Sequence, residues 1–152
     1  VGKHIYQLHH SPHLFEINDI HPASMQILHI AAHIDAIENQ IYPRLSRGIN
    51  IVLDRTWWST WVYGKLSGVD EKPLRLMINA ELYYWGKNKP NAVFLIDTPS
   101  PFRKDDKDEY FNDLRVLYKN LVEQEKSKYP IHLISNDGSL SQTLDEIIKH
   151  VG

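Results

Sequence analysis

The sequence predicts an α/β fold, a three-layer arrangement in which a parallel sheet is flanked by helices. Two observations lead to this prediction. Short apolar runs, typical of strands buried on both faces, alternate with longer segments whose apolar residues recur every three or four positions. The connections between these segments are short, which favours a layered α/β structure over separate domains. We therefore expect a single domain over residues 1–152.

The first third of the chain contains two expected strands and one long helix. Residues 5–8 form a short apolar run that ends in a polar stretch, which is typical of a strand. From Pro22 to Leu45, isoleucine and leucine recur at helical spacing, and Gly48 follows as a terminating residue. Residues 49–53 are nearly all apolar and precede a charged pair, so a buried strand is expected there.

The middle of the chain is expected to form two helices and a strand. The helices are expected at 57–66 and 72–87, and the second is bounded by Pro73 near its start and by Gly86 after it. Residues 92–96 form another continuous apolar run, which indicates a third buried strand.

The last third of the chain repeats the alternation. Residues 108–126 carry apolar side chains at helical spacing, and residues 131–134 form a fourth short apolar run. A final helix is expected to begin near Ser139, because Ser139 and Gln142 have the spacing of a capping box.

Composition excludes several classes of protein. Cysteine is absent, which rules out a disulfide scaffold, a thiolate metal site and a cysteine nucleophile. The formal charge is −2 and the basic residues form no dense run, which argues against a nucleic-acid partner. No apolar stretch approaches the ~20 residues of a transmembrane helix, and no signal segment opens the chain. We expect a cytoplasmic protein without a membrane partner.

Polar residues directly after the expected strands mark where chemistry is expected, because open parallel sheets bind ligands at the carboxyl ends of their strands. These residues are His9 and His10, Asp54 and Arg55, Asp97 and Thr98, and Asn136 and Asp137. Asp54 and Arg55 are the most informative pair. A carboxylate can hold water on Mg²⁺ or orient an attacking oxygen, and a guanidinium binds phosphate through two hydrogen bonds. The pair indicates phosphoryl transfer; a structural ion pair that closes the strand is the alternative.

The segment from Asp54 to Gly64 resembles the Asp-Arg signature of thymidylate kinases and of the related deoxynucleoside and nucleotide kinases of the P-loop group. Asp54, Arg55, Ser59 and Tyr63 match this signature at its spacing. Further segments resemble the family in the same order: 41–48, 93–99, 110–118 and 134–138. The resemblance covers most of the chain and implies a fold like that of P-loop NTP hydrolases.

The resemblance also implies an activity. A nucleotide kinase, a transferase of nucleotide biosynthesis, would transfer the terminal phosphoryl group of Mg-ATP to a thymidylate-like nucleoside monophosphate or to a deoxynucleoside. ATP and Mg²⁺ would be its cofactors, and a homodimer is an assembly that the resemblance allows. Asp54 would act near the attacking oxygen and hold Mg²⁺ through water, Arg55 would bind the acceptor phosphate, and Arg103 would belong to a lid over the transferred group.

The acceptor pocket and the adenine site are implied in the same way. Ser59, Thr60 and Tyr63 would line the acceptor pocket, with Tyr63 near the sugar. Asn136 and Asp137 would lie in the loop on the adenine side of ATP. The alternative function is a non-catalytic nucleotide-binding or protein-interaction domain on a degenerate kinase scaffold.

Two histidines depart from the family pattern. His29 and His33 stand where thymidylate kinases present a phenylalanine that stacks on the base and an arginine that reads it. Imidazole can both stack and hydrogen-bond, so these histidines are candidate substrate-binding residues. Their spacing of four residues on a helix also permits half of a metal site, with His9, His10 and His13 as further ligands.

Two other segments have competing interpretations. Trp57, Trp58 and Trp61 can stack on a base or sugar, but packing against neighbouring helices is the favoured interpretation for at least two of them. Residues 101–108 are either a short lid that carries Arg103 or, because they are acidic, a solvated helix start.

The glycine-rich phosphate loop of P-loop kinases, Gly-x-x-x-x-Gly-Lys-Ser/Thr, does not occur in the sequence. The chain aligns from near the family's second strand, which would leave a gap in the sheet between residues 49–53 and 93–96. We favour the interpretation that the sequence is part of a longer kinase chain. In the alternative, the strands close up and ATP chemistry is lost.

Overall fold

A computed structural model describes residues 1–101 and 108–151 of the chain. The chain divides into two compact units, Val1–Lys87 and Asn88–Gly152. We refer to them as the helical unit and the sheet unit and describe each by itself. The expectation of one domain over residues 1–152 stays a prediction.

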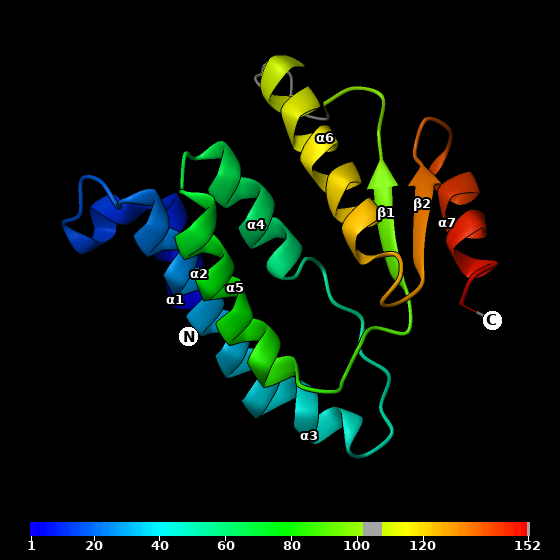
Figure 1. The fold of residues 1–152 in the computed structure, drawn as a ribbon, viewed down its shortest axis with the longest axis horizontal. Coiled ribbons are helices and arrows are strands. Elements are labelled where there is room, and N and C mark those ends of the chain that lie inside the picture. Colours follow the sequence, from blue (N-terminus) through cyan, green and yellow to red (C-terminus); the bar gives the residue numbers. More distant parts are fainter. Residues whose placement is uncertain (102–107, 152) are drawn as a thin grey trace. The chain divides into compact units, whose positions relative to one another are not determined.

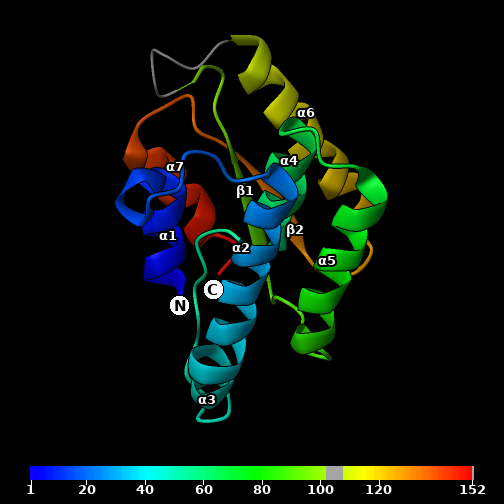
Figure 2. The same ribbon diagram turned by 90° about the vertical axis from the view of Figure 1, so that its left-hand side faces the viewer.

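The helical unit consists of five α-helices and two irregular turns of helix. In chain order these are α1 (Gly2–His10), a 3₁₀ turn (Pro12–Phe15), α2 (Pro22–Ala36), a π turn (Ile37–Ile41), α3 (Tyr42–Leu45), α4 (Trp57–Leu66) and α5 (Glu71–Trp85). Helix α2 packs against α1, α4 and α5, and it runs alongside α5 in Figures 1 and 2. The fully buried side chains of this packing include Ile37, Val62 and Leu74, so the core of the unit lies between α2, α4 and α5.

The long helix expected from Pro22 to Leu45 forms, with one irregularity. Pro22 occupies the first turn of α2, and the His21 side chain accepts a hydrogen bond from the backbone N–H of Ala23, which caps the helix. The π turn Ile37–Ile41 follows, and it buries both of its isoleucines. Gly48 then adopts a φ of 73°, the left-handed conformation that glycine permits after a helix.

Helices α4 and α5 confirm the helices expected at 57–66 and 72–87 and show where the tryptophans go. Trp58 and Trp61 are buried, which confirms the packing role predicted for two of the three tryptophans. A Cβ atom on Gly64 would lie 2.8 Å from Cδ1 of Leu74. Gly64 therefore lets α4 approach α5 closely.

The sheet unit has two parallel strands between two helices. Strands β1 (Val93–Asp97) and β2 (Ile131–Ser135) pair from Val93 opposite Ile131 to Asp97 opposite Ser135. Helices α6 (Asp108–Glu125) and α7 (Leu140–Ile148) lie to either side of the strands in Figures 1 and 2. Ser139 and Gln142 form the expected capping box at the start of α7. All four elements expected from this part of the sequence are therefore present.

The strand expected at residues 5–8 is wrong, because these residues belong to helix α1. Ile5 is buried, and α1 packs against α2. A four-residue apolar run cannot by itself separate a strand from one turn of a buried helix. Packing against α2 decides the conformation here.

The strand expected at residues 49–53 is also wrong. This segment has no regular structure, and Val52 is 95% exposed. A strand is stabilised by hydrogen bonds to a neighbour, and within the described residues β1 pairs only with β2. The sheet of the described residues therefore has two strands rather than the four expected, and the chain is a helix-rich α/β protein. None of the described helices is both long and apolar enough to span a membrane.

Candidate functional site

The Asp54–Arg55 pair lies in the connection between α3 and α4, and both side chains are exposed. Arg55 has a φ of 69°, a left-handed conformation that is uncommon for a residue other than glycine. Such strained positions are concentrated at binding and catalytic sites, where surrounding structure holds them. Within the described part of the chain, Asp54 makes no hydrogen bond or ion pair. The two charged groups are therefore not joined as a structural ion pair.

Helix α4 places Tyr63 beside Arg55. The guanidinium carbon of Arg55 lies 5.5 Å from the centre of the Tyr63 ring, which is the geometry of a cation–π contact. Ser59 lies one turn before Tyr63 on the same helix and is half-buried. Thr60 is only 4% exposed. The structure thus brings Arg55 and Tyr63 together on one side of α4, whereas Thr60 belongs to the buried side.

His29 lies on α2 and contacts α1. Its Nε2 atom is 3.2 Å from Nδ1 of His9, and the two rings meet edge to face. Burial, together with the nearby charges of His9, His33 and His10, lowers the pKa of His29 from 6.5 to about 4. At neutral pH His29 is therefore an uncharged ring, which suits stacking better than charge pairing.

His33 is held by a residue that sequence analysis missed. Its Nδ1 atom lies 2.8 Å from Oε2 of Glu81 on α5, and the Glu81 side chain is 1% exposed. The other carboxylate oxygen of Glu81 accepts a hydrogen bond of 3.3 Å from Nε1 of Trp85. Glu81 follows Leu74 and Ile78 at helical spacing, so an acidic residue in the apolar stripe of α5 was the available signal.

The metal interpretation of the histidines gains no support. His29 is turned to His9, and His33 is turned to Glu81. Among residues 1–101 and 108–151, no group of three or more His, Asp or Glu side chains is placed to hold a metal ion. A site built only from these side chains is therefore not formed.

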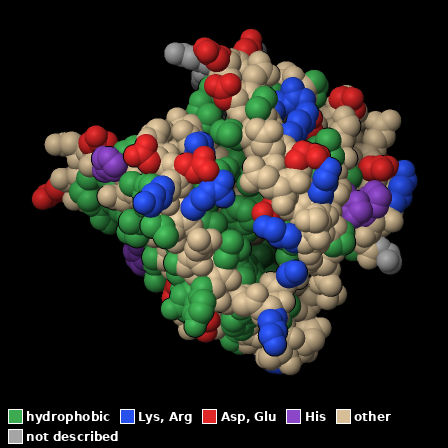
Figure 3. Space-filling view, in the orientation of Figure 1, with side chains coloured by type: hydrophobic (Ala, Val, Ile, Leu, Met, Phe, Trp, Pro, Cys, Tyr) green, Lys and Arg blue, Asp and Glu red, His purple; other side chains and the backbone are tan. Residues whose placement is uncertain are grey.

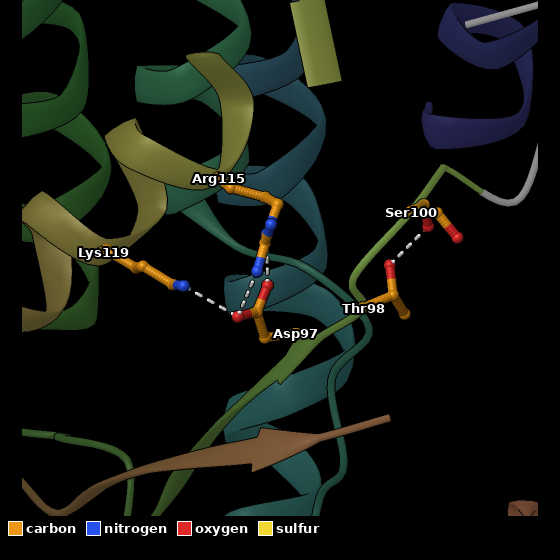
Figure 4. A network of polar contacts seen from close by, with 5 residues as sticks. All are labelled: Asp97, Thr98, Ser100, Arg115 and Lys119. Carbon is orange, nitrogen blue, oxygen red and sulfur yellow. Dashed lines mark hydrogen bonds and ion pairs between the residues drawn. The ribbon is translucent and has the colours of Figure 1, made fainter. Parts of the chain in front are cut away.

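Asp97, at the carboxyl end of β1, is the centre of a charged network in the sheet unit (Figure 4). Its two carboxylate oxygens accept hydrogen bonds of 2.6 and 2.9 Å from Nε and a terminal nitrogen of Arg115, and Nζ of Lys119 lies 2.8 Å away. The hydrogen bonds from Arg115, aided by Lys119 and opposed by partial burial, lower the pKa of Asp97 to about 2. Thr98 turns away from this network and donates its hydroxyl to the carbonyl of Ser100.

The carboxyl ends of β1 and β2 also form a shallow hollow of about 360 Å³. It is lined by Thr98, Pro99, Ser100, Pro101, Asn136, Asp137 and Gly138. The backbone N–H of Asn136 donates to the carbonyl of Asp97 at 2.8 Å, and its side-chain oxygen accepts from the hydroxyl of Thr143 at 2.9 Å. Asn136 is thereby fixed, and Asp137 is exposed beside it.

The predicted lid residue Arg103 lies outside the described residues. Helix α6 begins at Asp108 with Asp108 and Glu109 in its first turn. Positive and negative side chains are interspersed over the face seen in Figure 3.

Comparison with known proteins gives one family. The family model described as "Thymidylate kinase" matches residues 11–136. A thymidylate kinase of Francisella philomiragia subsp. philomiragia is 28% identical over an alignment of 148 residues, and the match covers 88% of this chain and 67% of that protein. A thymidylate kinase of Francisella tularensis subsp. holarctica is 30% identical over an alignment of 118 residues, and the match covers 68% of this chain and 55% of that protein. No solved structure matches.

Proposed function

Because this chain belongs to the thymidylate kinase family, we propose that it binds the phosphoryl acceptor in a transfer from Mg-ATP to a nucleoside monophosphate or deoxynucleoside. The single observation that supports this proposal best is the exposed Asp54–Arg55 pair beside Tyr63, with Arg55 held at a φ of 69°. A strained, exposed guanidinium with no anionic partner among the described residues has its hydrogen-bonding capacity available for a ligand.

Arg55 is proposed to bind the acceptor phosphate. A guanidinium offers parallel N–H donors that match two phosphate oxygens, which fixes the orientation of the bound group as well as its position. The contact with the Tyr63 ring restricts where the guanidinium lies. Less side-chain freedom is then lost when phosphate binds.

Asp54 is proposed to serve Mg²⁺. This ion keeps several water molecules and is commonly bound by only one or two carboxylates together with substrate phosphates. A single exposed carboxylate next to a phosphate-binding arginine fits that pattern, and the absence of a three-residue cluster in the described residues does not conflict with it. When bound, Mg²⁺ would neutralise charge on the phosphates. Asp54 would position the attacking oxygen against them.

The base and sugar of the acceptor are assigned to α2 and α4. The neutral ring of His29 is suited to stacking, and His33 is suited to hydrogen bonding with the base edge. Ser59 and Tyr63 would face the sugar from α4. Thr60 is buried, so its part in the proposal is to shape the wall of the pocket from behind.

The adenine side of ATP is assigned to the hollow at the ends of β1 and β2. Asn136 and Asp137 line it, and the fixed Asn136 gives it a rigid edge. Arg103 is proposed to neutralise charge on the transferred phosphoryl group. For the fold, we also propose the three-layer arrangement of a parallel sheet between helices that the sequence predicts.

Binding of dTMP to the chain, measured by isothermal titration calorimetry, tests the acceptor site. Arg55→Ala should weaken binding about 10- to 100-fold, because hydrogen bonds to charged groups contribute about 1.5–3 kcal/mol and 1.4 kcal/mol is a factor of ten. Arg47→Ala is the matched control, because it removes the same charge just after α3, where Arg47 donates to the carbonyl of Pro43. Equal affinities for the parent and Arg55→Ala would refute the assignment.

A further inference from the structure

Glu81 is an ionisable residue in the core of the helical unit that the proposed function does not use. Its side chain is 1% exposed, and it lies on the stripe of α5 that packs against α2. Burying a carboxylate costs several kcal/mol. An apolar residue would fill this position at lower cost, so the carboxylate calls for a role other than packing.

Among the described residues, each of the two oxygens of Glu81 has one hydrogen-bond partner. Oε1 accepts from Nε1 of Trp85, and Oε2 lies against Nδ1 of His33. An indole N–H can only donate. An ionised carboxylate can only accept, so the hydrogen between Glu81 and His33 lies on Nδ1 of the imidazole.

This arrangement fixes what His33 offers on its other side. In a neutral imidazole only one nitrogen carries hydrogen. When the imidazole is neutral and its hydrogen is on Nδ1, the Nε2 atom is a hydrogen-bond acceptor. The His33 side chain is 31% exposed, and within the described residues Nε2 has no hydrogen-bond partner. An acceptor nitrogen is therefore left available to a ligand.

We propose that Glu81 is a positioning residue that holds His33 with Nε2 as an acceptor, so that the site prefers bases with a ring N–H on their pairing edge. This inference rests on the proposed function. Thymine and uracil carry such a hydrogen on N3, whereas N3 of cytosine is itself an acceptor. The site therefore binds dUMP more tightly than dCMP, two ligands of the same charge and sugar.

The chain offers a substitution that reverses this arrangement. In Glu81→Gln, the Trp85 N–H still requires an oxygen, so the amide oxygen turns to Trp85 and the amide NH₂ turns to His33. Nδ1 must then accept, and the imidazole hydrogen moves to Nε2. In the double variant Glu81→Gln with Trp85→Phe, the amide oxygen is free to turn back to His33, which restores the original tautomer.

Nitrogen-15 NMR of the His33 ring at mildly alkaline pH tests the hydrogen bond without a nucleotide. We expect the hydrogen on Nδ1 in the parent and in Trp85→Phe, on Nε2 in Glu81→Gln, and again on Nδ1 in the double variant. The matched control is Glu125→Gln, which changes the buried carboxylate of the sheet unit that Lys128 and Tyr129 bind. A parent ring with its hydrogen on Nε2, or no change in Glu81→Gln, would overturn the inference.

Calorimetry with dUMP and dCMP at the same mildly alkaline pH tests the consequence for binding. We expect the parent to favour dUMP about tenfold, as one hydrogen bond gained or lost implies. Glu81→Gln should lose or invert this preference, the double variant should regain it, and Glu125→Gln should keep it. If Glu81 had only a structural role, Glu81→Gln would weaken the binding of both nucleotides equally. If the parent binds dUMP and dCMP equally well, or if Glu81→Gln keeps the preference for dUMP, the inference about Glu81 is wrong but the proposed acceptor site is not contradicted. If the parent binds neither, the proposed function fails, and the inference with it.

Discussion

Asp54 and Asp97 each follow a run of five mainly apolar residues, yet the protein holds them in different ways. Asp97 ends a strand, and its carboxylate is bound by Arg115 and Lys119. Asp54 ends a segment without regular structure, is exposed, and precedes the strained Arg55.

The difference separates a charge used by the fold from one available to a ligand. The carboxylate of Asp97 is hydrogen-bonded within the sheet unit, and its bonds to Arg115 connect β1 to α6. Asp54 and Arg55 make no ion pair within the described residues. Substitutions around Asp97 should therefore change stability, and substitutions at Asp54 and Arg55 should change binding.

The largest expected contrast is between two arginine substitutions. Arg55→Ala should weaken dTMP binding about 10- to 100-fold and leave the melting temperature unchanged. Arg115→Ala should lower the melting temperature, because the Asp97 carboxylate loses two hydrogen bonds and, among the described residues, keeps the contact with Lys119. Calorimetric titration and thermal melting of both variants check the contrast. A lower melting temperature for Arg55→Ala, with no change for Arg115→Ala, would contradict this assignment of Arg55 to binding and Arg115 to stability.

The two aspartates should differ in their contribution to the free energy of unfolding. Asp97→Asn should cost about 1.5 kcal/mol, the low end for charge-assisted hydrogen bonds, because the side chain is only partly buried. Asp54→Asn should change the free energy of unfolding by less than about 0.5 kcal/mol, as is usual for exposed positions. Urea denaturation measures both values. Equal losses would show that Asp54 also supports the fold.

The apolar runs before these aspartates show what the sequence can and cannot predict. Residues 92–96 and 49–53 have the same pattern, but only the first forms a strand, in β1, because β2 supplies its hydrogen bonds. Pairing is a property of the neighbours and is invisible in a five-residue run. The helices at 57–66 and 72–87 were predictable, because the spacing of their apolar residues or the residues at their ends can be recognised within the segment itself.

The candidate site was predictable to a similar degree. Arg55 and Tyr63 were identified by the resemblance to the thymidylate kinase signature, and the structure brings them together. The partners of His33 and Asp97 were not identified, because Glu81 is 48 residues from His33 and Arg115 is 18 residues from Asp97 in the chain. Such contacts are set by helix packing. The placement of Glu81 in an apolar stripe was the one local sign of them.

Acid should destabilise the chain in two separate pH ranges. The pKa of His29 is lowered from 6.5 to about 4, so its stabilising effect is complete above pH 6.5 and is lost as the pH falls through about 4. The pKa of Asp97 is lowered from 3.8 to about 2, so its effect is complete above pH 3.8 and is lost as the pH falls through about 2.

Denaturation measured across these ranges assigns each one. His29→Gln should make the free energy of unfolding less dependent on pH between 6.5 and 4. Asp97→Asn should do the same between pH 3.8 and 2. Asp54→Asn, as the control, should alter neither. If one of these single substitutions removed the pH dependence in both ranges, His29 and Asp97 would not each account for one range.

The smallest expected effect is at the strained backbone. Arg55→Gly should relieve a left-handed conformation that costs a residue with a side chain about 1–2 kcal/mol, although the extra freedom of glycine in the unfolded chain offsets much of the gain. We expect a small rise in melting temperature together with loss of dTMP binding. A lower melting temperature would show that the Arg55 side chain stabilises the fold through Tyr63.

The most direct test of the acceptor site is a titration of the isotope-labelled chain with dTMP, followed by amide NMR shifts. We expect the largest shifts at residues 54–63 and at His29 and His33. Shifts confined to residues 136–138, or no shifts at all, would contradict the assignment of the acceptor to the Asp54–Arg55 segment.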